Sequence, residues 1–425
     1  MNGEIGVGRA VQARIYRDGV FGRLPRVPVS APALEAAARR RMSSAAFAYV
    51  AGSAGLESTA YANRSAFERW QIVPRMLVDV SSRDLSVELF GRRYPTPLLT
   101  APIGVLEMAH PDADVAVARA AAERGVPMIF STQASRSMED CAEAMGDAAR
   151  WYQLYWSNSD ELVESLVSRA ERAGCEAIVV TLDTHALGWR PRDLDLAYLP
   201  FSRGLGIAQY TSDPVFTELV RHRAATPADG GQPRPTLAAV GALFSMARHY
   251  PGGFWRNVRS PLPRAAVETF LDVFARPSLT WDNLAFLRER TTLPILLKGI
   301  LDPADATRAL DHGVDGIVVS NHGGRQVDGS IGALDALPAV ADAVGGAAPV
   351  LFDSGVRGGA DIFKALALGA SAVCVGRPYV YGLALAGQAG VYDVLSNLLA
   401  EFDLTMGLTG CASVKEITRD RLRPA

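Results

Sequence analysis

The chain has 425 residues, and its 43 Lys and Arg nearly balance its 45 Asp and Glu, for a formal net charge of −2. This balance argues against a general nucleic-acid binder, which carries a basic excess to displace counterions from phosphates. Apolar residues make up 49% of the chain and charged residues 21%, so the chain can bury a large core.

The sequence also carries none of the usual signals for a membrane or secreted protein. No stretch approaches the roughly 18 consecutive apolar residues of a membrane span, and the N-terminal residues lack the apolar region of a secretory signal. We therefore expect a cytoplasmic protein without a transmembrane segment. The four cysteines, Cys141, Cys175, Cys374 and Cys411, are far apart and form no CxxC pair, so we expect reduced thiols and no metal site.

Residues 1–96 show a mixed pattern that differs from the rest of the chain. They contain a helical pattern over 32–50 and a strand-like stretch at 92–96. We expect them to form an accessory segment that caps the bottom of the main fold or covers its mouth, and we expect no separate domain there.

From residue 97 onward, short apolar runs alternate with helical patterns rich in Ala and Leu. Eight runs qualify as strands: 97–102, 126–130, 151–155, 177–183, 294–299, 315–323, 349–355 and 371–377. The helices between them begin on polar residues and end on Gly, as at 112–125 and 159–174. Nearly continuous apolar strands indicate a parallel sheet that is buried on both faces. The pattern predicts a (β/α)8 TIM barrel over 97–425. A doubly wound open sheet is the alternative, disfavoured because no GxGxxG turn follows the first strand.

Residues 184–293 form a connection several times longer than the others, between the fourth and fifth strands. Such long loops in a compact domain are usually functional or disordered, so we expect a lid on the C-terminal face of the barrel. Within it, residues 221–264 hold seven Arg against one acid, Asp229. A solvated, partly ordered lid is the favoured interpretation, and contact with a membrane surface or a partner is the alternative.

Polar residues follow the predicted strands at the end where a barrel places its active site. In a parallel barrel the C-terminal ends of all strands open onto one face, so residues far apart in sequence converge there. The strand ends carry Gly104, Ser131, Gln153, Tyr155, Thr181, Asp183, Lys298, Ser320, Asn321, His322, Arg325, Asp353, Gly376 and Arg377. A purely structural barrel has little reason to gather so many ionisable groups on one rim, so we expect the active site there.

Three of these features indicate chemistry. Lys298 ends an apolar run, so its ammonium needs a negative partner: it either faces a group that becomes anionic in the reaction or only pairs with Asp353. In SNHGGRQ, His322 and Arg325 flank two glycines, which places a base that acts near neutral pH beside a cation for a carboxylate. The Gly and Arg residues of 353–359 and 376–378 indicate a phosphate site after strands seven and eight.

With these motifs, the sequence resembles the FMN-dependent 2-hydroxy acid oxidases and dehydrogenases, the group of glycolate oxidase, lactate oxidase and flavocytochrome b2. The resemblance covers 47–418 apart from the insertion and rests on SNHGGRQ, the Lys-Gly pair of the fifth strand, DSGVRGGADIFKALALGA and GRP. It implies a homotetramer or octamer that binds FMN and oxidises an L-2-hydroxy acid to the 2-oxo acid. That reaction needs a base, a carboxylate clamp and a cation for the reduced cofactor.

The resemblance also implies catalytic roles for individual residues. His322 would be the active-site base, and Asp183 would hold and charge-compensate its imidazolium. Tyr155 would contact the substrate hydroxyl or stabilise its transition state. Lys298 would lie near the N1–C2=O edge of the flavin and favour its reduced form.

The same resemblance implies binding residues for the substrate and the cofactor. The substrate carboxylate would be bound by Tyr49, Arg190 and Arg325. FMN would contact the backbone of Pro102, Ile103 and Gly104, the side chains of Ser131, Gln153, Thr181, Ser320 and Asp353, and, at its phosphate, Gly355, Arg357, Gly376 and Arg377.

Within the family, the sequence is most similar to lactate 2-monooxygenase, through APIGVLEMAHP (101–111), LDTHALGWRPRDL (182–194) and LPFSRGLGIAQYTSDPVF (199–216). That likeness implies oxidation of L-lactate with O2 to acetate, CO2 and water. Gly104 would stand beside flavin N5, where lactate oxidases carry Ala. The missing methyl would open a cavity that alters oxygen access or product retention; alternatively, the glycine only accommodates a different packing.

Departures from the family pattern leave the substrate and the electron acceptor open. His185 replaces a Pro or Trp, Gln133 replaces the aromatic residue of glycolate oxidases, and the insertion is longer than in the monooxygenase. Together with Trp189 and Leu106, His185 would shape a pocket for a larger acid. The alternatives are therefore a peroxide-releasing oxidase, or a dehydrogenase that passes electrons to a quinone or another carrier, acting on a larger 2-hydroxy acid.

Overall fold

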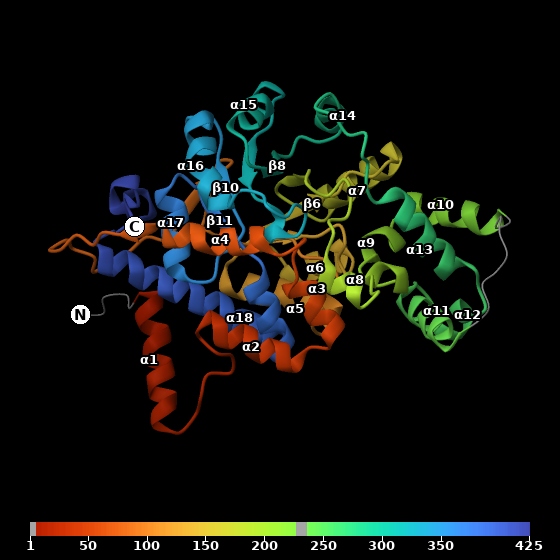
Figure 1. Ribbon diagram of the computed structural model, residues 1–425, viewed down its shortest axis with the longest axis horizontal. Helices are drawn as coiled ribbons and strands as arrows, with labels where there is room; N and C mark the ends of the chain where they lie inside the picture. The colour runs from red at the N-terminus through yellow and green to blue at the C-terminus, as the bar shows by residue number, and fades with distance from the viewer. Residues whose placement is uncertain (1–5, 227–235) are drawn as a thin grey trace.

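The computed structural model describes residues 6–226 and 236–425, and at its centre eight parallel strands close into a barrel (Figure 1). These strands are β4 (Leu98–Thr100), β5 (Met128–Phe130), β6 (Arg150–Leu154), β7 (Ile178–Thr181), β8 (Ile295–Ile300), β9 (Gly316–Val319), β10 (Val350–Phe352) and β11 (Ala372–Val375). They follow one another around the barrel in chain order, and β11 pairs with β4 to close it. Each strand overlaps one of the eight predicted runs, so the (β/α)8 prediction is confirmed and the open sheet is wrong.

Helices cover the outside of the barrel and alternate with its strands. They are α5 (Ala113–Arg124), α6 (Met138–Met145), α7 (Asp160–Arg172), α14 (Asn283–Arg288), α15 (Pro303–Asp311), α16 (Ala333–Val344), α17 (Gly359–Ala367) and α18 (Arg377–Thr409). The two helices predicted at 112–125 and 159–174 are α5 and α7, and their ends follow the expected rules. Ser159 Oγ accepts the N–H of Leu162 at 3.2 Å, and Gly125 ends α5 with a φ of 70°.

The N-terminal part contributes four helices, α1 (Val7–Val20), α2 (Ala31–Arg41), α3 (Ser44–Ala51) and α4 (Ser58–Glu68). The prediction of a single helix over 32–50 was wrong, because the chain breaks between α2 and α3. Met42 is extended, with a ψ of 153°, and Ser43 begins α3 by accepting the N–H of Ala46 at 3.2 Å. A serine that caps a new helix in this way competes with continuation of the preceding one.

Residues of the N-terminal segment lie at both ends of the barrel. The hairpin of β2 (Val87–Leu89) and β3 (Arg92–Tyr94), which overlaps the predicted strand-like stretch, packs Leu89 and Tyr94 against inward-facing residues of the strands. The rings of Tyr94 and Trp151 lie 6.1 Å apart. The hairpin therefore closes the bottom of the barrel, while Tyr49 of α3 lines a cavity at the mouth.

The long insertion is mostly helical. It contains α8 (Pro191–Asp195), α9 (Ala208–Thr211), α10 (Pro214–Ala225), α11 (Leu237–His249), α12 (Phe254–Val258) and α13 (Leu262–Val273). Figure 1 shows α10 to α13 gathered on one side of the molecule. An ion pair of 3.2 Å joins His249 of α11 to Glu107, in the loop after β4. Two charged residues of the basic stretch, Asp229 and Arg234, lie outside the described residues.

The remaining elements are short. They are β1 (Trp70–Ile72), β12 (Leu422–Pro424) and the 3-10 helices η1 (Leu106–Met108), η2 (Pro200–Arg203), η3 (His322–Gly324), η4 (Val414–Glu416) and η5 (Arg419–Arg421). β1 pairs antiparallel with β12, which ties the C-terminal residues to the N-terminal part. All four cysteines are buried and unbridged. Over the described ranges, none of the helices has the length and apolar character that crossing a membrane requires.

Candidate active site

Alternation along the barrel strands separates an apolar floor from a polar rim. Successive residues of a strand point to opposite sides, so every second one points into the barrel. Toward the bottom these inward-facing residues are apolar, such as Ile129, Trp151 and Val179, and they form one core cluster. Two positions further along the strands stand Ser131, Gln153, Thr181, Lys298, Ser320 and Asp353. The period of two therefore accounts for the polar ring at the C-terminal end.

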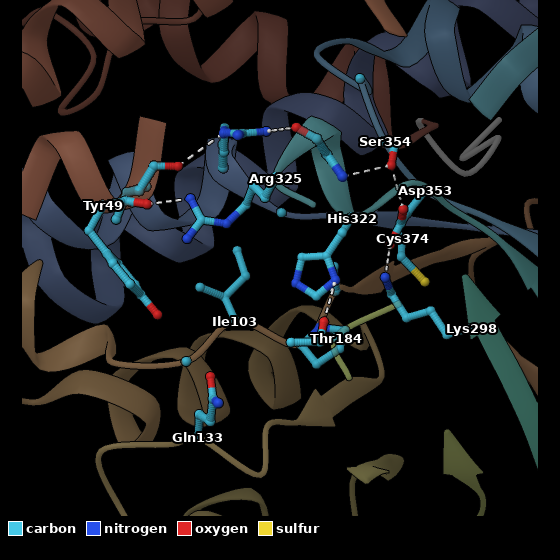
Figure 2. A pocket seen from close by; sticks show the side chains of 18 of the residues that line it. Tyr49, Ile103, Gln133, Thr184, Lys298, His322, Arg325, Asp353, Ser354 and Cys374 are labelled. Carbon is cyan, nitrogen blue, oxygen red and sulfur yellow. Dashed lines mark hydrogen bonds and ion pairs between the residues drawn. The ribbon is translucent and has the colours of Figure 1, made fainter. Parts of the chain in front are cut away.

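A cavity opens at this rim (Figure 2). The predicted site residues that line it are Tyr49, Pro102, Ile103, Gly104, Tyr155, Arg190, Lys298, His322, Arg325, Asp353, Gly355, Arg357, Gly376 and Arg377. The predicted residues Ser131, Gln153, Thr181 and Ser320 are buried but do not line it. Asp183 touches the site through His322. All the predicted site residues thus meet in one region of the protein.

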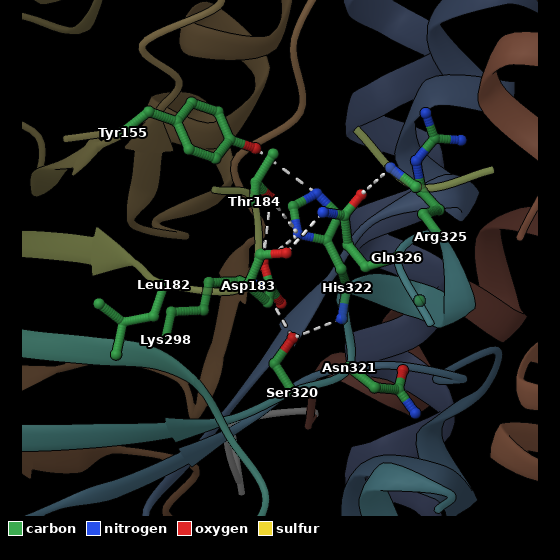
Figure 3. Close-up of polar contacts among 12 residues, drawn as sticks. Tyr155, Leu182, Asp183, Thr184, Lys298, Ser320, Asn321, His322, Arg325 and Gln326 are labelled. Carbon is green, nitrogen blue, oxygen red and sulfur yellow. Dashed lines mark hydrogen bonds and ion pairs between the residues drawn. The ribbon is translucent and has the colours of Figure 1, made fainter. Parts of the chain in front are cut away.

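His322 lies at the centre of the polar contacts (Figure 3). Its Nδ1 is 2.7 Å from Asp183 Oδ1, and its Nε2 is 3.5 Å from the Tyr155 hydroxyl. Thr184 donates to the same Asp183 oxygen at 3.0 Å. Burial opposes ionisation of Asp183, but the charge and hydrogen bond of His322 prevail and lower its pKa to about 2. The ionised carboxylate fixes Nδ1 as a donor, which leaves Nε2 free to accept a proton.

The electrostatics of His322 predict an acid limb in the pH profile. Burial lowers the pKa of His322 from its ordinary 6.5, although Asp183 pulls it upward. The imidazole is therefore half-protonated at a pH below 6.5. We expect the rate of flavin reduction by substrate, measured anaerobically, to change little above pH 7.5 and to fall as the pH drops below 6.5. A fall that already begins above pH 7.5 would contradict this assignment.

The backbone at His322 is strained. Its φ of 58° lies in the left-handed region, which costs a non-glycine residue on the order of 1 kcal/mol. Two hydrogen bonds of 3.0 Å hold the turn: the His322 N–H donates to Ser320 Oγ, and the Gly323 N–H donates to Ser354 Oγ. The protein therefore keeps the imidazole in place against a local conformational preference.

Lys298 is buried beside an acid, as expected for a lysine inside a barrel. Its Nζ lies 3.0 Å from Asp353 Oδ2 and donates to Ser320 Oγ at 2.8 Å. Burial alone would lower the pKa of Lys298, but the carboxylates of Asp353 and Asp183 outweigh it and raise the pKa. The lysine is therefore a permanent cation that faces the cavity.

Two arginines, Arg190 and Arg325, lie near each other at the opposite wall, with the half-buried carboxylate of Asp193 as the nearby acid. Arg190 donates through Nε to the Arg325 carbonyl at 3.1 Å and through Nη2 to Gln326 at 2.8 Å, and Arg325 donates to Gly52 O at 3.0 Å. Burial, helped by the charge of Arg325, lowers the pKa of Arg190 to about 10. Neither arginine takes part in an ion pair among the described residues. Two like charges at one wall of the cavity, with Arg190 buried and Arg325 half-buried, favour the binding of an anion between them.

A second pair of cations lies where the phosphate site was expected. Burial lowers the pKa of Arg357, and burial together with Arg357 lowers that of Arg377 to about 9. Within the described ranges neither forms an ion pair with a carboxylate. Arg377 donates to Gly323 O, Gly52 O and Ser53 Oγ, each at 3.0 Å, whereas Arg357 Nη1 donates only to Val356 O at 2.9 Å. This end of the cavity is therefore also suited to an anion.

Two buried polar atoms of the inward-facing ring have no hydrogen-bond partner. Gln153 Nε2 and Thr181 Oγ1 are fully covered and form no hydrogen bond among the described residues. Leaving such groups unpaired costs on the order of 1 to 3 kcal/mol each. Both stand on the inward-facing polar ring, so a polar ligand in the barrel mouth would satisfy them.

The space beside Gly104 is filled. A Cβ at this position would lie 2.8 Å from Gln133 Cβ and 2.9 Å from the Gln133 carbonyl oxygen. The expectation of an open cavity left by a missing methyl was therefore wrong, and the alternative of a different packing holds. Gly104 is needed because the turn at Gln133 approaches it closely.

We expect Gly104→Ala to destabilise the protein by about 1 to 3 kcal/mol, because the methyl must displace a backbone carbonyl. Gly19→Ala is the matched control: Gly19 lies in α1 with nothing near its added Cβ, and alanine favours helices. Thermal unfolding of the two variants checks this. A melting temperature of Gly104→Ala equal to that of the parent chain would contradict it.

Several residues expected at the substrate do not reach it. Trp189 is 73% exposed, His185 is exposed, and Leu106 is buried; none of the three lines the cavity. The insertion instead contributes Leu187 and Phe201. Their expected role in shaping the substrate pocket was therefore wrong.

Gln326 was missed by sequence reasoning, although it stands inside the quoted SNHGGRQ motif. Its Oε1 accepts from Arg190 at 2.8 Å and from the Gly188 N–H at 3.3 Å. Its Nε2 donates to the carbonyls of Ala186, at 2.9 Å, and Asp183. One side chain therefore holds the segment that carries both Asp183 and Arg190. Its place directly after Arg325 was the only signal in the sequence.

The chain is similar to known proteins along almost its whole length. The profile of FMN-dependent dehydrogenases matches residues 38–424. An FMN-dependent alpha-hydroxy acid dehydrogenase, qulF, of Penicillium citrinum is 44% identical over 413 residues, 97% of this chain and 95% of that one. An L-lactate oxidase of Lysinibacillus sphaericus is 44% identical over 388 residues, 91% of each chain.

Aromatic 2-hydroxy acid oxidases are also similar. A 4-hydroxymandelate oxidase of Amycolatopsis orientalis is 38% identical over 386 residues, 91% of this chain and 96% of that one. The crystal structure of a mandelate oxidase with (S)-4-hydroxymandelic acid superposes with a TM-score of 0.76 at 38% identity. The match covers 94% of this chain and 99% of that one.

Proposed function

Because the chain belongs to the FMN-dependent dehydrogenase family, whose members oxidise 2-hydroxy acids, we propose that it converts an L-2-hydroxy acid, L-lactate or a close analogue, to the 2-oxo acid with O2 as acceptor. The observation that carries this proposal is the Arg190–Arg325 pair. The pair is suited to bind a carboxylate, and His322, whose Nε2 can accept a proton, lines the same cavity.

The cavity residues fit the cofactor of the family. Arg357 and Arg377 would hold the dianionic phosphate of FMN with the backbone of Gly355 and Gly376, which line the same end. Gln153 Nε2 and Thr181 Oγ1 would form hydrogen bonds with the polar atoms of the flavin ring. Lys298 and Asp353 would contact other polar atoms of FMN. When bound, FMN takes up the two electrons that leave C2 of the substrate and passes them to the acceptor.

The residues of the chain would divide the remaining work of the reaction. Arg190, Arg325 and the hydroxyl of Tyr49 would bind the substrate carboxylate and orient C2 toward His322. Converting the alcohol to the ketone releases two protons and two electrons, and His322 Nε2 would accept one of these protons. Asp183, at 2.7 Å, would then stabilise the imidazolium. Tyr155, 3.5 Å from Nε2, would bond the substrate oxygen as its charge changes.

The lid would determine what becomes of the product. Arg190, Leu187 and Phe201 come from 184–293, and the Glu107–His249 pair ties α11 to the loop after β4. A lid that retains pyruvate while peroxide forms would give acetate, CO2 and water, which is the monooxygenase outcome. The alternatives are release of 2-oxo acid and peroxide, or transfer of the electrons to a quinone or another carrier with a larger acid as substrate. The mandelate oxidase likeness favours the larger acid.

The test is the absorption spectrum of the anaerobic protein before and after addition of L-lactate. Bleaching of the flavin band would support an L-lactate oxidiser, and reoxidation by air would support O2 as acceptor. Acetate formed in equal amount to O2 consumed would identify the monooxygenase. Pyruvate and peroxide would identify the oxidase. A band that stays unchanged with L-lactate but bleaches with L-mandelate would replace lactate by a larger acid.

The assembly and the lid are further parts of the proposal. We propose a homotetramer or octamer, with 97–425 as the catalytic unit, 1–96 as its cap and 184–293 as its lid. Light scattering of the purified protein tests the assembly, and a monomer mass of 45.3 kDa would contradict it.

A further inference from the structure

Gln133 carries a buried amide that nothing in the protein satisfies. The residue is 6% exposed, stands in the loop after β5 and lines the cavity (Figure 2). Its Nε2 is fully covered and forms no hydrogen bond in the described structure. Its backbone is fixed, since its N–H donates to Ser131 Oγ at 3.1 Å and its carbonyl accepts from the Val105 N–H at 2.9 Å. The amide is thus a buried, unpaired donor on a residue that lines the cavity.

The proposed binding mode leaves one wall of the cavity for the substrate side chain. The two arginines take the carboxylate, and His322 with Tyr155 takes the hydroxyl. The lining residues left for the side chain include Gly104, Gln133, Leu187 and Phe201. Its other polar neighbour, Thr184, already donates to Asp183. Gln133 is therefore the one free polar group of this wall among the described residues.

From this geometry we infer that Gln133 is a specificity-determining residue that selects 2-hydroxy acids with a hydrogen-bond acceptor on the side chain, one or two bonds beyond C3. The inference rests on the proposed function. An apolar side chain leaves the amide buried and unpaired, whereas an ether, carbonyl or amide oxygen at that distance satisfies it. Leu187 and Phe201 would pack on the carbon atoms around that oxygen. A site that bonds a polar group discriminates strongly against an isostere that lacks it.

A matched pair of substrates tests this inference. 2-Hydroxy-3-methoxypropanoate and 2-hydroxypentanoate, both of L configuration, differ only by an ether oxygen in place of a methylene. We expect the parent holoenzyme to show a kcat/KM about tenfold higher for the ether in anaerobic flavin reduction. In Gln133→Leu the preference should disappear or reverse, because an apolar wall favours the methylene. Gln133→Met, which keeps an unbranched side chain, should behave likewise.

A second readout separates substrate selection from an effect on the cofactor. The unreactive acids 3-methoxypropanoate and pentanoate should perturb the flavin spectrum with dissociation constants that show the same ether preference, lost in both variants. An equal preference in parent and variants would overturn the inference. A change in FMN affinity without a change in the ether preference would also overturn the inference, because the amide would then contact the flavin and not the substrate. If neither these substrates nor L-lactate or L-mandelate reduces the flavin, the proposed function itself fails.

Discussion

His322→Ala is expected to leave FMN bound and to slow anaerobic flavin reduction by substrate on the order of 10,000-fold. The substitution removes the only proton acceptor that Asp183 positions in the cavity, at 2.7 Å, and general-base catalysis contributes up to about that factor. The cofactor should remain, because none of the proposed phosphate contacts involves the imidazole. The measurement is stopped-flow absorbance of the flavin band together with the FMN content of the purified variant.

The backbone of His322 provides the matched control for this substitution. At a φ of 58°, asparagine adopts the left-handed conformation more readily than alanine, so His322→Asn should keep the turn intact while still lacking a base. Both variants should be equally slow if the loss is chemical. Near-parental flavin reduction in either variant would remove His322 from its proposed role. Recovery in His322→Asn alone would show that the turn, and not the base, was lost.

Arg357→Met is expected to weaken FMN binding about 10- to 100-fold and to leave the flavin-free protein as stable as the parent or more stable. One charge-assisted bond to the phosphate accounts for the loss. This stability is expected because burial lowers the pKa of Arg357 and because its guanidinium forms a single hydrogen bond among the described residues, to the Val356 carbonyl. Without an anion this cation costs more than it contributes. Flavin fluorescence titration and thermal unfolding of the apoprotein are the measurements.

Arg377→Met is the comparison for Arg357→Met, because we expect it to lower the stability of the apoprotein. Arg377 also binds the N-terminal segment to the His322 turn, through Gly52, Ser53 and Gly323 at 3.0 Å each. Its removal should weaken FMN binding and lower the stability of the apoprotein as well. If both substitutions destabilised the apoprotein equally, Arg357 would contribute to the stability of the apoprotein itself and would not depend on a bound anion.

The barrel and the polar ring of the candidate site could be predicted because both follow from a period of two, whereas Tyr49 and Arg190 were implied only by the family resemblance. Each strand is a short apolar run, and continuing its inward-facing positions by two residues leads from Val318 to Ser320 and from Leu351 to Asp353. The geometry of a parallel barrel then brings these positions together, whatever their separation in sequence.

Residues on the connecting loops could not be located in this way. Neither Gln326 nor Phe201 lies on a strand, and their places depend on how 184–293 folds. The break between α2 and α3 could not be predicted either. Ser43 caps a new helix there, although the helical pattern of the sequence continues through it. The outward position of Trp189 depends on a turn that no periodicity describes. Tertiary contacts of this kind have no signature in a single sequence.

The contact between Gly104 and Gln133 restricts the order in which this site can change. Because the obstacle to a Cβ at position 104 includes the Gln133 carbonyl oxygen, at 2.9 Å, no side chain at position 133 removes it. A mutational path toward alanine at position 104 must first move the turn at Ser131–Ala134. Descendants of this chain, in nature or in directed evolution, would therefore gain a new side chain at position 133 much more easily than a methyl at position 104.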